Sequence, residues 1–430
     1  MSSSSGWLAR ARASSSGKFQ RDALWNFGSV AVLGVCGYGL NFLIGRFWGS
    51  APLGVFNQVM AAYVFFSQAA VGGVNLSVLR AMSEHRADRS KVASIIAGAL
   101  PPTLALASAF TLLFYLSRHA VADLLDSPGV AEGMAMATPG LFLFALNKVG
   151  MSVVNGAQRM RAFAIYTSLR YVAMVAGLGL AAWRDMSADH IAVLFSVAEG
   201  VLFVPLAFEV ARQMSAPIRD WRPWQREHLV YGVKSAGAGM LMELNSRVDV
   251  LMLGYFLSDG PVGVYSFAAL VAEGVFQLLI VLQNNYNPIL AEHIAARRQA
   301  ELQPIIAKGK RVTYALMAVV GAATLAVFPL FLWILDREEF AAGWTPLAVL
   351  VGGIVVISGF MPFQHALLMG NRPAWHTRMM ASVVILNVFL NALLIPFFGL
   401  AGASAATAAA MIWSVAALRV LARREVGLQL

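Results

Sequence analysis

The sequence predicts an all-α polytopic membrane protein with twelve transmembrane helices in two pseudo-symmetric six-helix lobes around a central cavity. Three observations support this fold class: long apolar runs, an alternation of basic connecting segments, and a repeat between the two halves. The 430-residue chain is 59% hydrophobic and only 13% charged, whereas soluble proteins carry about 25% charged residues. Composition therefore favours a membrane protein over a soluble one.

Twelve apolar runs are long enough to cross a bilayer, which needs about 20 residues per helix. They lie near residues 24–47, 54–79, 92–117, 131–155, 163–183, 190–211, 229–256, 262–290, 304–335, 343–369, 376–396 and 400–421. The Ser-rich, basic N-terminal stretch has no apolar core and is typical of a disordered tail. The predicted segments are a cytoplasmic tail (1–22), an N-lobe (23–213), a cytoplasmic linker (214–228) and a C-lobe (229–430).

Lys and Arg residues between these runs and near their ends are concentrated on alternate sides of the predicted membrane. All but four of them lie on the side of the N-terminus; the exceptions are Arg46, Arg118, Arg184 and Arg337. The positive-inside rule then places both termini in the cytoplasm. The net charge of +10 is thereby explained by membrane topology rather than by nucleic-acid binding.

Several functional classes are excluded by what the connecting segments and cysteines lack. No predicted outer loop exceeds about 15 residues, so the chain has no room for a catalytic domain outside the membrane. The single cysteine, Cys36, excludes a disulfide framework and a cysteine metal site. We expect neither enzymatic activity nor a cofactor or metal.

The two halves resemble each other. GRFWGSAPLGVF at Gly45–Phe56 aligns with GYFLSDGPVGVY at Gly254–Tyr265, and a repeat in the same orientation implies two related lobes. At the same offset Gln68 aligns with Gln277 and Asn75 with Asn284. Each amide pair is seven residues apart, on one face of a helix. The pairs predict facing walls of a wet cavity, or else hydrogen bonds between helices.

The segment Val248–Leu270, VDVLMLGYFLSDGPVGVYSFAAL, carries a sharper pattern. It resembles the signature of helices 7 and 8 in polysaccharide exporters. The positions that carry the resemblance are Asp249, Gly254, Gly263, Tyr265, Ser266 and Ala268. The chain is therefore similar to Wzx-type lipid-linked oligosaccharide (O-antigen or polysaccharide) flippases, within the superfamily that also contains multidrug and toxin extruders.

This resemblance implies a function. A polyprenyl-pyrophosphate carrying a short oligosaccharide would move from the cytoplasmic to the outer leaflet of a bacterial inner membrane by alternating access. Coupling to H⁺ or Na⁺, often proposed as antiport, would drive it, and polysaccharide polymerase or assembly machinery would be a partner. The alternative is a proton- or sodium-coupled multidrug extruder of the same superfamily, which would bind cationic drugs through acidic residues.

Charged residues inside the predicted spans are the candidate site, because such residues are rare in membranes and usually functional. The cations are Lys148, Arg170, Lys234 and Arg247, and the acids are Glu199, Glu243, Asp249 and Glu273. We expect the cations and the four amides Gln68, Asn75, Gln277 and Asn284 to bind substrate, with the first three cations near the inner side, where they could hold a diphosphate. The alternative for the lysines is that they reach to the interface.

The four acids are candidates for ion coupling, since a mid-membrane carboxyl can load and release a proton near neutral pH; the alternative for each is a structural ion pair. Glu273 is preferred because it shares a helix face with Gln277 and Asn284, and Glu243 comes second. Glu243 can also pair with Arg247 four residues on, while Asp249 points to another side of the helix. Helices 9 to 12 carry no mid-span charge, only Gln364, His365, Asn387 and Asn391.

Overall fold

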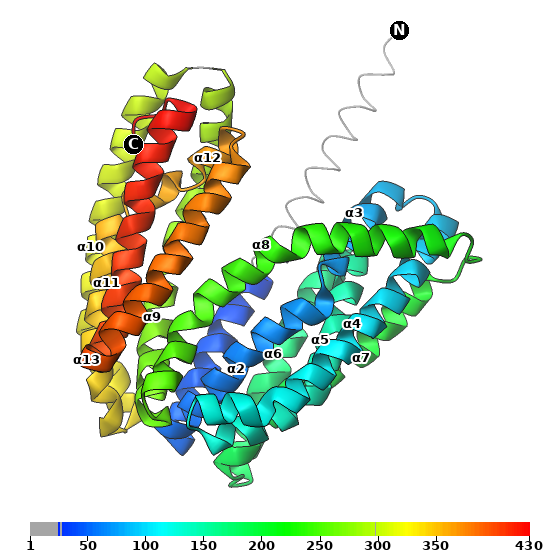
Figure 1. Cartoon of the computed structure of the whole chain (residues 1–430), viewed down its shortest axis with the longest axis horizontal. Coiled ribbons are helices and arrows are strands. Elements are labelled where there is room, and N and C mark those ends of the chain that lie inside the picture. The colour runs from blue at the N-terminus through cyan, green and yellow to red at the C-terminus, as the bar shows by residue number, and fades with distance from the viewer. Residues whose placement is uncertain (1–24, 26–27, 297) are drawn as a thin grey trace. The chain divides into compact units, whose positions relative to one another are not determined.

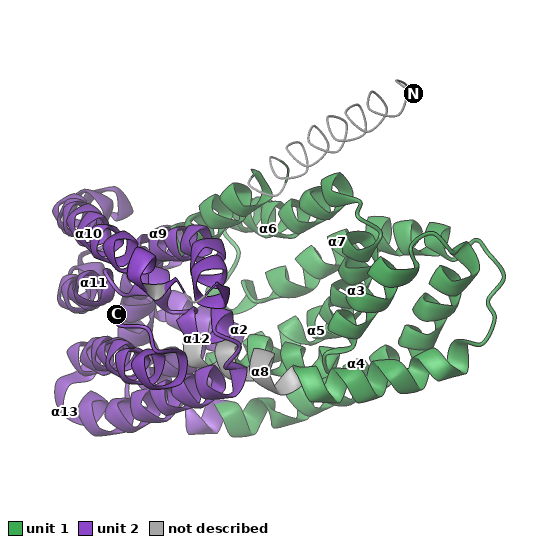
Figure 2. Ribbon diagram, turned by 90° about the horizontal axis from the view of Figure 1, so that it is seen from above, with its two compact units in different colours: residues 1–43, 62–121, 129–240 green, residues 44–61, 122–128, 241–430 purple. Residues whose placement is uncertain are grey.

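The computed structural model describes Trp25, residues 28–296 and residues 298–430, and within them all side chains except those of 236–246 and 299. The predicted tail over 1–22 lies outside these residues. Figure 2 shows two compact units: unit 1 holds residues 1–43, 62–121 and 129–240, and unit 2 holds 44–61, 122–128 and 241–430. Assignment of residues to an N-lobe and a C-lobe stays a prediction.

The part of the chain that the structure describes is helical and contains no strand (Figure 1). A first helix over Gly28–Trp48 precedes the labelled elements. The helices are α2 (Ser50–Val71), α3 (Val74–His85), α4 (Arg89–Leu124), α5 (Pro128–Gly156), α6 (Met160–Trp183), α7 (Val193–Gln213), α8 (Trp221–Phe256), α9 (Asp259–Ala295), α10 (Gln299–Leu335), α11 (Trp344–Ile357), α12 (Ala366–Met369) and α13 (Pro373–Leu421). Short helical turns are η1 (Ala188–His190), η2 (Glu338–Gly343), η3 (Met361–Phe363) and η4 (Ala422–Val426).

Within the described residues, nine helices are long and apolar enough to cross a membrane, or ten if the bent pair α2 and α3 is one span. Helix α8 is not among them, because Lys234, Glu243, Arg247 and Asp249 interrupt its apolar stretch. The predicted spans 376–396 and 400–421 form one long element, α13, which Gly399 divides by its non-helical backbone (φ 54°, ψ −128°). The number of twelve spans therefore stays a prediction.

Two of the predicted spans are interrupted. The run 54–79 breaks at Gly72 and Gly73, whose φ values of 54° and 71° belong to the left-handed region that favours glycine; α2 and α3 are bent by 50° there. Gln68 and Asn75 are consequently not on one continuous helical face. The run 343–369 ends as a helix at Ile357 and continues through η3, where Pro362 cannot donate a backbone hydrogen bond.

Aliphatic side chains pack the interior of each unit. In unit 1 a fully buried cluster joins α3, α4 and α5, with Val78, Ile95 and Val153 among its members. In unit 2 a second cluster joins the inner parts of α9, α10 and η3 around Leu290, Ile306 and Phe363. The two clusters include α5 and α9, which also carry polar side chains described below.

The predicted repeat reappears at one contact inside unit 2. A Cβ built on Gly54 of α2 would lie 2.8 Å from the carbonyl carbon of Asp259, and a Cβ on Gly263 of α9 would lie 2.8 Å from the carbonyl carbon of Ser50. Ser50 and Asp259, like Gly54 and Gly263, are equivalent positions of the repeat. The starts of two equivalent helices therefore meet symmetrically at glycines, which allow this close approach.

Candidate functional site

A buried ion pair is the centre of the polar cluster in unit 1. Glu199 on α7 is 3% exposed, and its Oε1 lies 2.7 Å from Nε of Arg170 on α6. Its Oε2 accepts hydrogen bonds from Nη2 of Arg170 at 3.1 Å and from Nδ2 of Asn147 on α5 at 2.8 Å. The carboxylate is thus contacted from two other helices, α5 and α6, and pairs with one of the cations that the sequence predicts for substrate binding.

A second cation joins this cluster through an aromatic ring. The Phe144 ring centroid is 4.9 Å from Cζ of Arg170 and 5.8 Å from Nζ of Lys148, distances typical of cation–π interactions. Tyr63 packs edge-on against Phe144 at 5.9 Å and stacks on Phe195 at 4.9 Å. Two of the predicted cations therefore lie beside one carboxylate and one aromatic ring in this cluster.

The polar cluster of unit 2 surrounds Asp249 of α8. Its Oδ2 accepts hydrogen bonds from Oγ1 of Thr407 at 2.6 Å and from Oη of Tyr265 at 3.1 Å. Its Oδ1 accepts one from Nδ2 of Asn391 at 3.0 Å, and the same amide group also donates to Asn387. Residues from α8, α9 and both parts of α13 therefore converge on one carboxylate.

This arrangement is suited to holding a proton or a small hard cation. The carboxylate, hydroxyl and amide oxygens are ligands that hard cations prefer. Asn391 is fully buried, and its Oδ1 has no hydrogen-bond partner among the described residues, which is costly in an apolar interior unless something binds there. The described residues contain no group of three or more His, Cys, Asp or Glu side chains that could hold a metal.

The structure leaves the other predicted site residues apart from these clusters. Glu273, Gln277 and Asn284 are exposed on α9, although they do follow one another along a continuous helix. Lys234 is exposed on α8, while Gln68, Asn75 and Arg247 are half-buried. The side chain of Glu243 lies outside the described residues, so its pairing with Arg247 stays a prediction.

Sequence reasoning missed several partners in the clusters. Asn147, Tyr265 and Thr407 are ordinary polar residues in apolar runs, with no charge to mark them. The i, i+4 spacing of Asn387 and Asn391, two amides at mid-span, was a detectable signal. A further ion pair that the sequence reasoning missed joins Arg159 to Glu209, which is buried near the end of α7. Glu209 lies at the end of a predicted span, where a charged residue is not unusual.

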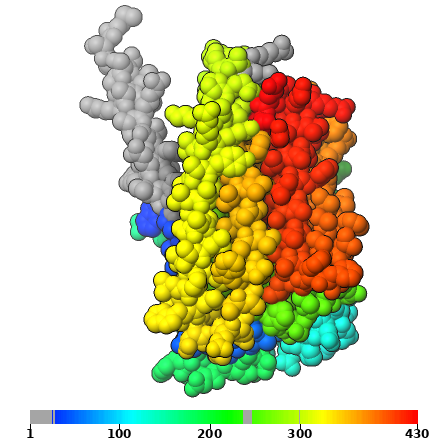
Figure 3. Space-filling model, turned by 90° about the vertical axis from the view of Figure 1, so that its left-hand side faces the viewer, coloured from blue at the N-terminus to red at the C-terminus, as the bar shows by residue number. Residues whose placement is uncertain are grey.

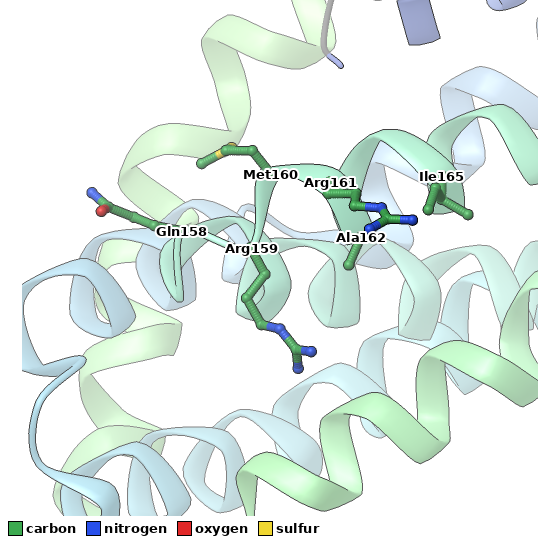
Figure 4. Close-up of a pocket in the computed structure, with 6 residues that line it drawn as sticks. All are labelled: Gln158, Arg159, Met160, Arg161, Ala162 and Ile165. Atoms are coloured by element: carbon green, nitrogen blue, oxygen red, sulfur yellow. The ribbon is translucent and has the colours of Figure 1, made fainter. Parts of the chain in front are cut away.

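One open pocket of about 400 Å³ lies at the start of α6 and is separate from both clusters. Figure 4 shows the side chains that line it: Gln158, Arg159, Met160, Arg161, Ala162 and Ile165. The guanidinium of Arg161 lies 5.2 Å from the Trp25 ring centroid, and Arg159 is occupied by Glu209. None of the candidate site residues predicted from the sequence lines this pocket.

Comparison with known proteins identifies relatives of both sequence and fold. A family model described as "Polysaccharide biosynthesis protein" matches residues 19–294. The chain is 23% identical over 384 residues to the "Probable low-salt glycan biosynthesis flippase Agl15" of Haloferax volcanii, covering 88% of this chain and 78% of that protein.

Two solved structures have the same fold. An inward-facing multidrug resistance MATE family transporter of the MOP superfamily aligns with a TM-score of 0.78 at 12% identity, covering 91% of this chain and 94% of that one. The lipid II flippase MurJ, in an inward closed conformation, aligns with a TM-score of 0.72 at 14% identity, covering 94% and 87%. The expected all-α polytopic transporter fold is thereby confirmed, and these relatives are transporters and flippases rather than enzymes.

Proposed function

Because the chain belongs to the polysaccharide biosynthesis protein family, we propose that it flips a polyprenyl-pyrophosphate-linked oligosaccharide from the cytoplasmic to the outer leaflet. The membrane would be the cytoplasmic membrane, with both termini in the cytoplasm, as the distribution of Lys and Arg favours. The flippase named among its relatives acts in glycan biosynthesis, which supports a glycan lipid as the substrate class. Polysaccharide polymerase or assembly proteins would receive the product.

The observation that carries the substrate proposal is the basic cluster of unit 1. Lys148 and Arg170 share the Phe144 ring, and Glu199 pairs with Arg170. A diphosphate is a fitting ligand because it offers several anionic oxygens to a lysine and to the planar fork of an arginine. Glu199 would hold Arg170 in place between transport cycles and share it when the diphosphate arrives.

The remaining predicted substrate residues have a different part in the proposal. Exposed amides such as Gln277 and Asn284 can exchange hydrogen bonds with sugar hydroxyls and water. Lys234 and Arg247 would add positive charge along α8. We expect these groups to guide the oligosaccharide rather than to anchor the diphosphate.

Ion coupling is assigned to Asp249 rather than to Glu273. Asp249 receives hydrogen bonds from three side chains on two other helices, whereas Glu273 is exposed on α9. Binding of H⁺ or Na⁺ to Asp249 would change the charge that Tyr265, Asn391 and Thr407 surround. Such a change can alter the packing of α8 against α13 and so favour one transport state.

Alternating access would use the glycine contact between α2 and α9. Around it, Gln58 Nε2 donates to Asp259 Oδ1 at 2.8 Å and Ser127 Oγ donates to Asp259 Oδ2 at 2.9 Å. The loops involved lie on the proposed outer side of the membrane. These contacts would close the outer entrance in this state and separate when substrate leaves.

Two charge reversals test the substrate proposal. Lys148→Glu and Arg170→Glu are each expected to abolish appearance of the lipid-linked oligosaccharide in the outer leaflet, with the protein still inserted. Lys308→Glu, an exposed cation on α10, is the matched control and should export normally. Normal export by both cluster variants would refute the proposal, and unchanged glycan with altered drug tolerance on deletion would instead support a multidrug extruder.

Asp249→Asn tests the coupling proposal. The variant should bind substrate but lose the dependence of transport on the ion gradient, whereas Glu273→Gln should keep it. Measuring transport in vesicles with a proton gradient or a sodium gradient alone identifies the ion. Retention of the normal gradient dependence by Asp249→Asn would remove Asp249 from this role.

A further inference from the structure

Two cations in unit 2 share one aromatic ring that is not part of the polar cluster around Asp249. Nζ of Lys310 on α10 lies 4.0 Å from the Phe360 ring centroid, and Cζ of Arg419 on α13 lies 5.4 Å from the same centroid. Because both cations lie on the same ring, the distance between Nζ of Lys310 and Cζ of Arg419 is at most the sum of these two distances. At that separation the two positive charges repel each other. Neither belongs to an ion pair in the described part of the chain.

Tyr314 packs against the residue that precedes Phe360. Phe360 follows the end of α11, where the ring of Tyr314 packs directly on Gly359. The Tyr314 hydroxyl donates a hydrogen bond to the Val356 carbonyl oxygen at 3.2 Å. Tyr314 is one turn from Lys310, so the same contact that braces α10 against α11 also fixes where Lys310 can reach.

An apolar strip continues from the cations along α11. Val356 and Gly352 of α11 precede Phe360 and are four residues apart, so they lie on the same side of that helix. Val356 is 55% exposed, and a Cβ on Gly352 would meet nothing within 4 Å. Ile412, 46% exposed and two turns from Arg419, faces the same way along α13.

The surface of unit 2 places these elements next to one another. Figure 3 shows α10 in yellow, α11 in orange and the end of α13 in red side by side on one face; α11 packs against both neighbours. Arg419 is twenty residues beyond Gly399 in α13, a rise of about 30 Å. That distance equals the thickness of the bilayer core, so Arg419 lies at the headgroup level if Gly399 is at the opposite boundary.

From this geometry we propose that Lys310 and Arg419 bind the phosphate of an anionic phospholipid, whose acyl chain lies along Val356 and Gly352. Two uncompensated cations attract one phosphate, and an exposed apolar strip beside them suits a hydrocarbon chain better than water. Under the proposed topology the site faces the cytoplasmic leaflet, where anionic lipids attract basic clusters. Bound lipid would fix the packing of α10 and α13 on α11.

The site is tested with the purified full-length protein in detergent micelles that contain phosphatidylcholine and phosphatidylglycerol. The number of phosphatidylglycerol molecules retained is counted by native mass spectrometry. Lys310→Gln with Arg419→Gln should lower the affinity about tenfold or more. Lys308→Gln with Arg423→Gln, which removes the same charge from exposed positions of the same two regions, should change it less than about twofold.

A second variant keeps both cations and therefore separates the site from general charge and from folding. Gly352→Leu fills the strip where open space now lies and should also release phosphatidylglycerol. Equal losses in the two double variants would overturn the proposal, and so would full retention by Gly352→Leu. Displacement of the lipid by millimolar inorganic phosphate would likewise overturn it, because the site would then bind free phosphate.

Discussion

Substitution of Gly54 by alanine is the sharpest test of the contact between α2 and α9. The new Cβ would lie 2.8 Å from the carbonyl carbon of Asp259 and 3.0 Å from the backbone nitrogen of Gly263, whereas ordinary contacts begin at 3.4 Å. For an ordinary contact, the distance from the new Cβ to the carbonyl carbon would have to grow from 2.8 to 3.4 Å, so the helices would have to separate. The distance to the carbonyl oxygen would have to grow by more. Overpacking of this kind costs about 1–3 kcal/mol.

Because the contact belongs to the state with the α2 and α9 ends closed, Gly54→Ala should shift the equilibrium away from that state by about 5- to 150-fold. The 2.8 Å hydrogen bond from Gln58 to Asp259 would lengthen at the same time. The protein should still fold, because the alternative state does not require the contact.

Oxidative crosslinking measures this shift. A Cβ on Gly260 would lie 3.6 Å from Oγ of Ser50, a spacing compatible with a disulfide, so S50C with G260C reports the closed state in a Cys36→Ser background. Gly54→Ala should slow the crosslinking at least fivefold. Gly179→Ala adds the same methyl group where nothing lies within 4 Å and should have no effect. Equal crosslinking rates in the two variants would refute the reasoning.

Three further predictions concern polar groups. Glu199→Gln should lower the free energy of unfolding in detergent by about 3 kcal/mol because Arg170 loses its buried counter-charge, and Glu199→Leu with Arg170→Met should recover stability but not transport. Arg159→Ala should cost about 2 kcal/mol by leaving Glu209 buried and unpaired; Glu209→Gln added to it should restore most of the loss, and no recovery would contradict the pairing. His228 precedes the seventh predicted span and contacts Ser77 and Ile95. Burial lowers the pKa of its imidazole, and the charges of Glu227 and Arg80 act on it as well. Stability should therefore fall as pH decreases below about 6.5, and thermal unfolding of His228→Gln should lack this dependence.

Sequence reasoning located the helices better than their interruptions. Apolar length and basic alternation are local properties, and they identified the runs that became helices α5 to α7 within a few residues of their ends, whereas α4 extends to Leu124, beyond the predicted end at 117. The break at Gly72 and Gly73 was missed because the two residues lie inside an unbroken apolar run. Their backbone conformation depends on packing against Gly232 of α8, a contact that no local pattern records.

The candidate site was predictable only where its charges stood out. Lys148, Arg170, Glu199 and Asp249 were recognised because charge in an apolar run is costly. The contacts that they make were not predicted, since Glu199 is 29 residues from Arg170 and Asp249 is 158 residues from Thr407. The preference for Glu273 came from helical spacing alone, which states that three residues share a face but not what that face contacts.

The repeat and the polar clusters point to separate tasks for the backbone and the side chains. The glycine contact is symmetric, because Gly54 and Gly263 meet the carbonyls of the equivalent positions Asp259 and Ser50. The repeat position of Asp249 is Leu40, so this charged group has no counterpart. Gly54→Ala and Gly263→Ala should consequently have similar effects that do not add, since both obstruct one contact. Substitutions in the two polar clusters should instead have different effects. Those in unit 1 should change substrate binding, and those in unit 2 should change the dependence of transport on the ion gradient.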